Sequence, residues 1–115
     1  MKYALLVYGC TAARDALSED DRRRVDADIA LLLARSNVSG WVRLQPVESA
    51  TTVRHEDGRT LLTDGPFVDS KEYLGGLIMV EAANLDEAIA AAGDFQATLA
   101  RHAGAIEVRP VLAAE

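Results

Sequence analysis

Apolar and polar residues alternate along several short stretches of this chain, and that alternation predicts β-strands. The first stretch runs from Lys2 to Tyr8, is rich in Tyr, Leu and Val, and stops at Gly9. Further stretches are predicted as strands at 41–45, 51–54, 60–63, 77–83 and 105–112. Because an Asp-Gly pair lies between 51–54 and 60–63, we expect these two strands to form a hairpin.

Two longer segments have the residue spacing of helices instead. Ser18 and Asn84 each stand at a typical helix start, with an acidic residue three positions later. The first helix is predicted to have an apolar stripe of Val25, Ile29, Leu32 and Leu33. The second is predicted to have a narrower stripe of Leu85, Ala88, Ile89 and Ala92. We expect the first helix to end before 37–40 and Gly93 to interrupt the second.

The predicted order of elements is strand, helix, strand, hairpin, strand, helix, strand. This order indicates a single domain over residues 1–115, a ferredoxin-like α+β sandwich of split βαβ units with an extra hairpin. Because side chains alternate between the two faces of a strand, the sequence also predicts which face is covered. We expect one apolar set to lie beneath the helices: Tyr3, Leu5, Val7, Ile78, Val80, Ala82, Ile106 and Val108.

The opposite face of the predicted sheet combines apolar and charged residues. It consists of Lys2, Ala4, Leu6, Tyr8, Leu77, Met79, Glu81, Ala105, Glu107, Arg109 and Val111. Left without helices, this face would expose a large apolar patch on a monomer. We therefore predict a homodimer in which two such faces pack together, with their charged residues paired or lining a polar cavity.

The segment 63–76 concentrates turn-forming and charged residues before the apolar strand 77–83. Pro66 lacks a backbone donor, so Asp64-Gly65-Pro66 cannot continue a helix or a central strand. We expect a shaped loop in which Asp64 fixes the turn. The pair Gly75-Gly76 is interpreted as a bulge or as a place where two backbones approach closely.

Composition and charge narrow the functional classes. The 115 residues have a formal net charge of −6, which argues against nucleic acid as a direct partner. The single cysteine, Cys10, allows no internal disulfide, and the separated His55 and His102 give no metal signature, so no metal and no cofactor are expected. No apolar run reaches the roughly 20 residues of a membrane span, and no signal peptide is visible. We expect a cytoplasmic protein without a membrane partner.

Four segments carry a family resemblance: Thr63-Asp64-Gly65-Pro66-Phe67, Leu74-Gly75-Gly76, Asn84-Leu85-Asp86-Glu87-Ala88, and Gly104-Ala105-Ile106-Glu107-Val108-Arg109-Pro110-Val111. With them the chain resembles the DGPF-type branch of the YCII-related family over nearly its whole length. The resemblance implies a dimeric α/β barrel. The YCII branch implies a small-molecule enzyme scaffold with a His–Asp pair, although this chain has no histidine on its first predicted helix. The DGPF branch implies association with an extracytoplasmic-function sigma factor.

The candidate site lies between the turn at 64–67 and the helix-free sheet face. Asp64 is the candidate general acid or base, and Lys71 is suited to meeting an anionic group as a mobile point charge. The other ligand-binding candidates are Tyr8, Arg43, Phe67, Glu81 and Arg109. Each role has a structural alternative: a turn cap for Asp64, an exposed ion pair with Glu72 for Lys71, and packing or interface pairing for the rest.

Three functional classes fit this sequence. The first is a metal-independent acid–base enzyme that acts on a small molecule in the dimer cavity. The second is a non-catalytic module that senses a ligand or serves as an accessory of a sigma factor. The third is a structural domain whose charged face only sets the register of the dimer.

Overall fold

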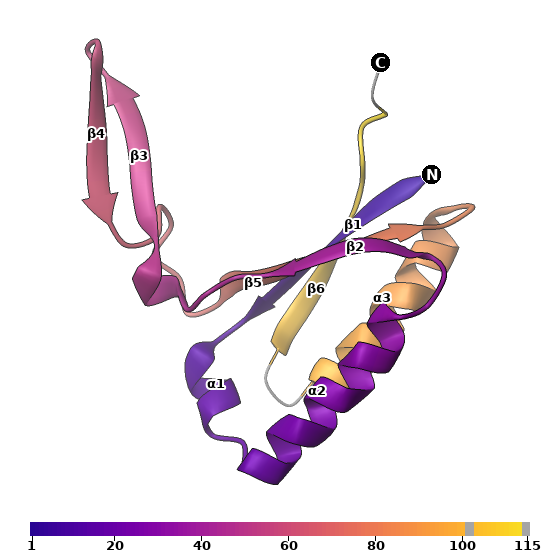
Figure 1. Cartoon of the computed structure of the whole chain (residues 1–115). Helices are drawn as coiled ribbons and strands as arrows, with labels where there is room; N and C mark the ends of the chain where they lie inside the picture. The colour runs from indigo at the N-terminus through magenta and orange to yellow at the C-terminus, as the bar shows by residue number, and fades with distance from the viewer. Residues whose placement is uncertain (101–102, 114–115) are drawn as a thin grey trace.

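The computed structural model describes residues 1–100 and 103–113, and Figure 1 shows their arrangement. His102 lies outside the described residues. The helices are α1 (Thr11–Asp15), α2 (Glu19–Leu33) and α3 (Leu85–Leu99), with a short 3-10 turn at Val47–Ser49. The strands are β1 (Lys2–Gly9), β2 (Val38–Arg43), β3 (Thr51–Glu56), β4 (Arg59–Asp64), β5 (Tyr73–Glu81) and β6 (Ala103–Pro110).

Four of the strands form one antiparallel sheet in the order β2-β5-β1-β6. Helices α2 and α3 lie together on one side of this sheet (Figure 1). The strands β3 and β4 pair only with each other and stand away from the rest (Figure 1). This is an α+β architecture compatible with the predicted ferredoxin-like fold. We call the four-stranded sheet with α2 and α3 the body, and the hairpin at 51–64 the arm.

The prediction of the covered sheet face is confirmed. Leu5 on β1 and Val80 on the neighbouring β5 lie on the same sheet face, and both are 0% exposed. They pack with Phe95, Ala88 and Ala92 of α3 in the main core cluster, whose other members include Tyr3 and Ile78. The remaining predicted residues, Val7, Ala82, Ile106 and Val108, pack against that cluster from its margin. Strand parity alone therefore located the hydrophobic core.

Both predicted helix starts are confirmed. The Ser18 hydroxyl oxygen accepts a hydrogen bond from the Asp21 backbone N–H at 3.0 Å, and the side-chain Oδ1 of Asn84 accepts one from the Glu87 backbone N–H at 3.0 Å. Each bond satisfies one of the backbone donors that a helix leaves unpaired at its beginning.

The prediction for the second helix is wrong in two details. Gly93 does not interrupt α3, which continues to Leu99 because Phe95 and Leu99 are buried against the body. Leu85 and Ile89 are about half-exposed, at 47% and 52%, so the buried stripe consists of Ala88, Ala92, Phe95 and Leu99. Tertiary packing outweighs the helix propensity cost of one glycine, roughly 1 kcal/mol.

Two further element boundaries differ from the prediction. Strand β2 begins at Val38 rather than at 41, and β5 begins at Tyr73 rather than at 77, so the last four residues of the predicted loop 63–76 are strand. The connection after β1 contains the short helix α1, which the sequence pattern did not indicate. The predicted hairpin is confirmed, because Asp57 and Gly58 both have positive φ, 50° and 74°, as a tight turn between twisted strands requires.

Candidate functional site

The residues predicted at the turn 64–67 lie at the base of the arm. Asp64 is the last residue of β4, is paired with Thr51 and is exposed. The following Gly65 has φ of +101°, which only glycine adopts without strain. Phe67 is 74% exposed, and Lys71 is exposed just before β5 begins. These residues share a segment of the chain, and none of them lines the cavity beside α2.

Tyr8, Glu81 and Arg109 lie on the helix-free sheet face but at different places along it. Glu81 is paired with Lys2 at one end of β1, while Tyr8 lies six residues further along that strand, roughly 20 Å away at the usual strand rise. The Tyr8 hydroxyl donates a hydrogen bond to Glu107 Oε1 at 3.4 Å. Glu81 instead forms an ion pair with the amino terminus at 3.5 Å. The structure therefore does not gather the predicted set into one site.

The placement of Arg43 on the helix-free face is wrong. In the register of the sheet, Arg43 lies opposite Gly76, which in turn lies opposite Val7. Val7 packs against the core on the helix-covered face, so Arg43 points towards α2. The alternation within β2 leaves open which side chains face the helices, and the pairing of β2 with β5 decides it.

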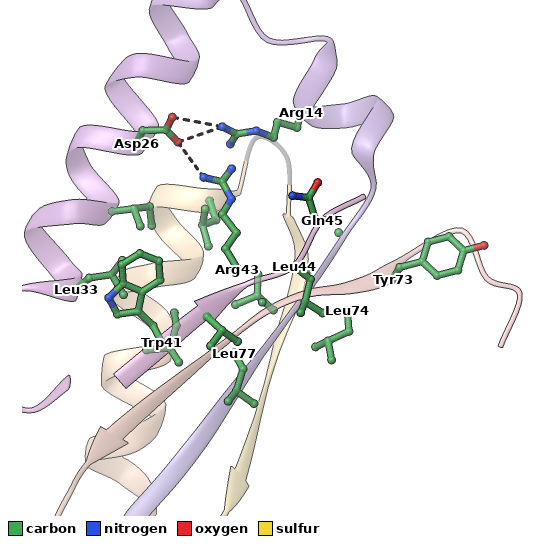
Figure 2. A pocket seen from close by; sticks show the side chains of 18 of the residues that line it. Arg14, Asp26, Leu33, Trp41, Arg43, Leu44, Gln45, Tyr73, Leu74 and Leu77 are labelled. Carbon is green, nitrogen blue, oxygen red and sulfur yellow. Dashed lines mark hydrogen bonds and ion pairs between the residues drawn. The ribbon is translucent and has the colours of Figure 1, made fainter. Parts of the chain in front are cut away.

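A cavity of about 760 Å³ opens between α2 and the β2 edge of the sheet. Its lining includes Arg43 but none of the other predicted site residues. Trp41, which is 53% exposed, forms an outer wall opposite Leu33 of α2 (Figure 2). The lining is mainly apolar and also includes Val7, Cys10, Ile29, Leu44, Ile78 and Leu99.

Three charged side chains meet on one side of this cavity (Figure 2). Arg14 Nη2 lies 3.3 Å from both carboxylate oxygens of Asp26 on α2. Arg43 Nη1 lies 3.9 Å from Asp26 Oδ1. Two guanidinium groups thus share one carboxylate, and the cluster keeps one excess positive charge in a chain whose net charge is −6.

The two arginines differ in how they are held. Arg14 spans both oxygens of Asp26 and its side chain is 27% exposed. Arg43 makes a single, longer contact with Asp26 and its side chain is 57% exposed. A guanidinium carries five N–H donors, so Arg43 retains donors that Asp26 does not use. These donors can form a bidentate pair with the carboxylate of a ligand.

The glycine pair 75–76 shapes the floor of the cavity. Gly75 is the extra residue of a β-bulge, since Val7 pairs with Gly76 while Tyr8 pairs with Leu74. Gly76 shares the strand face of Ile78, and a Cβ there would lie 3.0 Å from the Val42 carbonyl oxygen. Both interpretations of this pair, a bulge and a close backbone approach, are confirmed. The missing side chain at Gly76 also leaves space beneath α2.

Tyr73 lines one end of the cavity, but its hydroxyl group points away from it (Figure 2). The hydroxyl donates to Asp69 Oδ1 at 2.9 Å and accepts from the Ser70 backbone N–H at 3.2 Å. The Ser70 bond lowers the pKa of the phenol, but the Asp69 bond, partial burial and nearby carboxylates together raise that pKa above its ordinary 10.0. Tyr73 is thus a neutral hydrogen-bond donor at pH 7 that holds 69–73 in place.

Sequence reasoning missed Arg14, Asp26 and Trp41. Arg14 belongs to the short helix α1, whose five residues are too few for a periodic pattern. Asp26 had a usable signal: it stands three residues before Ile29 and seven before Leu33, so it flanks the apolar stripe of α2. Trp41 and Arg43 alternate with Val42 and Leu44, and this pattern does not tell which pair faces the helices.

Within the described part of the chain, no group of three or more His, Cys, Asp or Glu side chains is placed to hold a metal ion. Across the same residues, no helix is both long and apolar enough to cross a membrane.

The fold and its cavity define a small α+β protein with two arginines beside an apolar pocket. The chain belongs to the YCII-related domain family, whose profile matches residues 1–115. It is also 35% identical over 118 residues to an uncharacterised protein of Rhizobium meliloti strain 1021, covering 96% of this chain and 92% of the relative. The predicted family membership is confirmed, while the assignment to the DGPF branch stays a prediction.

Proposed function

We propose that this protein binds a small organic anion with an apolar body in the cavity between α2 and β2. The observation that carries the proposal is the cluster of Arg14, Asp26 and Arg43 beside an apolar pocket of about 760 Å³. Pockets of roughly 300–1,000 Å³ with few, well-placed polar groups are typical of small-molecule sites. A ligand carboxylate would meet Arg43, and its apolar part would lie between Leu33 and Trp41.

Binding without turnover fits this cavity better than acid–base catalysis. Asp26 is the carboxylate that lines it, and both of its oxygens are engaged by Arg14. Arg43 lies on the same carboxylate, so the Asp26 oxygens are directed at guanidinium groups rather than at the apolar space of the cavity. Asp64 is not among the lining residues. This favours a ligand-sensing protein over an enzyme. On this proposal, the sensor could act as an accessory of a sigma factor.

We further propose that the protein is a homodimer through its helix-free sheet face, which would complete the α/β barrel that the family resemblance implies. Leu6, Leu77 and Met79 on this face are only partly buried in the single chain. A second copy would cover them. On this proposal, Met79→Asp splits the dimer because it places an uncompensated charge in the interface.

The anion-binding proposal can be tested with the chain's only tryptophan, Trp41, as an intrinsic reporter. Phenylacetate and the isosteric neutral phenylacetamide are titrated while Trp41 fluorescence is recorded. We expect a saturable signal with phenylacetate and an affinity at least about tenfold lower for the amide, since a hydrogen bond to a charged group contributes about 1.5–3 kcal/mol. Equal affinity for the two probes, or no saturation, would contradict the proposal.

Two variants and one chemical label locate the site. Arg43→Gln removes the free guanidinium and is expected to lower phenylacetate affinity to that of the amide. Arg23→Gln is the matched control, because Arg23 lies on α2 outside the cavity and pairs with Glu19. The single cysteine, Cys10, lines the cavity and is half-buried. Its alkylation by N-ethylmaleimide should slow as phenylacetate saturates.

A further inference from the structure

The arm is the part of the molecule that the body does not support. No residue of 51–64 is buried, and the arm has no hydrogen-bonded pairing with the four-stranded sheet. A two-stranded hairpin by itself is at most marginally stable in water. A stable arm therefore requires contacts in addition to those that a single chain provides.

The arm nevertheless has a defined base. The Gly65 N–H donates to the Ala50 carbonyl oxygen at 2.7 Å, and the Thr52 hydroxyl donates to the Gly65 carbonyl oxygen at 2.7 Å. Pro46 and Pro66 restrict the two connections that join the arm to the body. The two hydrogen bonds close the base of the hairpin, and the arm extends from the sheet on the side away from α2 and α3 (Figure 1).

One face of the arm presents an uncovered apolar pair. Val53 and Leu62 lie directly opposite each other on the two strands and are 64% and 70% exposed. Phe67 and Val68, at 74% and 63% exposed, follow the arm's base. Because cross-strand neighbours point to the same face, Val53 and Leu62 form a contiguous apolar surface.

The accessible surface area of the chain is larger than that of a compact monomer of the same mass. Its accessible area is 7921 Å², whereas a compact monomer of 12.4 kDa exposes about 6,100 Å². Its radius of gyration is 16.0 Å, against about 13 Å for a compact domain of this length. The excess of about 1,800 Å² exceeds the roughly 800 Å² that each partner contributes to a standard interface. The arm contributes to this excess, because none of its residues is buried.

We infer that the arm is an exchange element: the Val53–Leu62 face of each arm packs against the body of a second copy of the chain. The partner is a second copy of the chain because each copy exposes both the Val53–Leu62 face of its arm and the helix-free face of its sheet. A twofold axis would cover both surfaces in both copies at once. This inference rests on the proposed dimer through the helix-free face. Each arm then adds contact area at the edge of the dimer interface formed by the helix-free faces. The body of the partner copy in turn stabilises the arm.

The experiment compares two leucines of nearly equal exposure in the full chain. Leu62→Glu places a charge on the arm, and Leu31→Glu places the same charge on the outer surface of α2, where Leu31 is 73% exposed. Sedimentation equilibrium at micromolar concentration measures the dimer dissociation constant. We expect Leu62→Glu to raise it at least tenfold and Leu31→Glu to leave it unchanged. Equal dissociation constants for both variants would overturn arm exchange while leaving the sheet-face dimer in place.

A second measurement separates docking from local unfolding of the arm. Amide hydrogen exchange of residues 51–64 in the wild-type protein should slow by at least tenfold between dilute and concentrated samples, as monomer becomes dimer. Fast exchange at every concentration would overturn the inference even if Leu62→Glu weakened association. A wild-type chain that stays monomeric at micromolar concentration would overturn both the dimer and the arm exchange, whereas the phenylacetate result would be unaffected.

Discussion

The body and the arm follow the same sequence rule with opposite results. In both, apolar and polar residues alternate, and a strand covers each predicted stretch in whole or in large part. In the body the apolar set faces two helices, so Leu5 and Val80 become fully buried. In the arm the equivalent residues, Val53 and Leu62, face no other element and stay mostly exposed. Alternation thus determines where a strand lies, whereas burial depends on what the rest of the chain provides.

The largest expected effect comes from removing the same two methyl groups in each region. Val80→Ala in the body should lower the free energy of unfolding by about 2 kcal/mol, because it leaves a void in a closed core. Val53→Ala in the arm should change it by less than about 0.5 kcal/mol in the dissociated chain. Urea unfolding at low protein concentration measures both values. Similar losses for the two variants would remove the distinction between body and arm.

Gly→Ala substitutions are expected to have a smaller effect on stability, and the sign of that effect should differ between the arm and the body. At Gly58, φ of +74° strains any other residue, so Gly58→Ala should destabilise the arm by about 1 kcal/mol and speed amide exchange at 51–64 about fivefold. At Gly93, inside α3 and with nothing within 4 Å of a new Cβ, Gly93→Ala should stabilise the body by about 0.5–1 kcal/mol. A lower melting temperature for Gly93→Ala would contradict this.

Much of the body could be predicted from the sequence because each signal there was local. The alternation in Lys2–Gly9 and the caps Ser18 and Asn84 each act within a few residues, and all are as expected. The errors at Leu85 and Ile89 arose where the sheet decides which side of α3 is covered. No pattern within a helix carries that information when small and large apolar residues occur on several sides.

The cavity was less predictable because it combines residues from distant segments. Arg14, Asp26 and Arg43 come from α1, α2 and β2, and their meeting depends on the face of the sheet that Arg43 occupies, which the pairing of β2 with β5 sets. A shift of one residue reverses the face of every side chain in a strand. The turn at Asp64–Phe67 attracted attention for its composition, and in the structure it forms the base of the arm.

The smallest expected effect on stability concerns the charge cluster of the cavity. Asp26→Asn should change the free energy of unfolding by less than about 0.5 kcal/mol, because the Asp26 side chain is 50% exposed and such pairs contribute little. The same change should raise phenylacetate affinity several-fold at low ionic strength, since both guanidinium groups lose their competing carboxylate. Asp28→Asn removes the same charge from an exposed position on α2 and serves as the control. Equal affinities for the two variants would contradict the role given to Asp26.

The most direct test of the central claim is a crystal structure of the protein with 4-bromophenylacetate, in which the bromine is located by its anomalous signal. The account predicts a bromine peak between Leu33 and Trp41, with the ligand carboxylate within hydrogen-bond distance of Arg43. A peak on the helix-free face beside Tyr8 and Glu107, with the cavity empty, would contradict it.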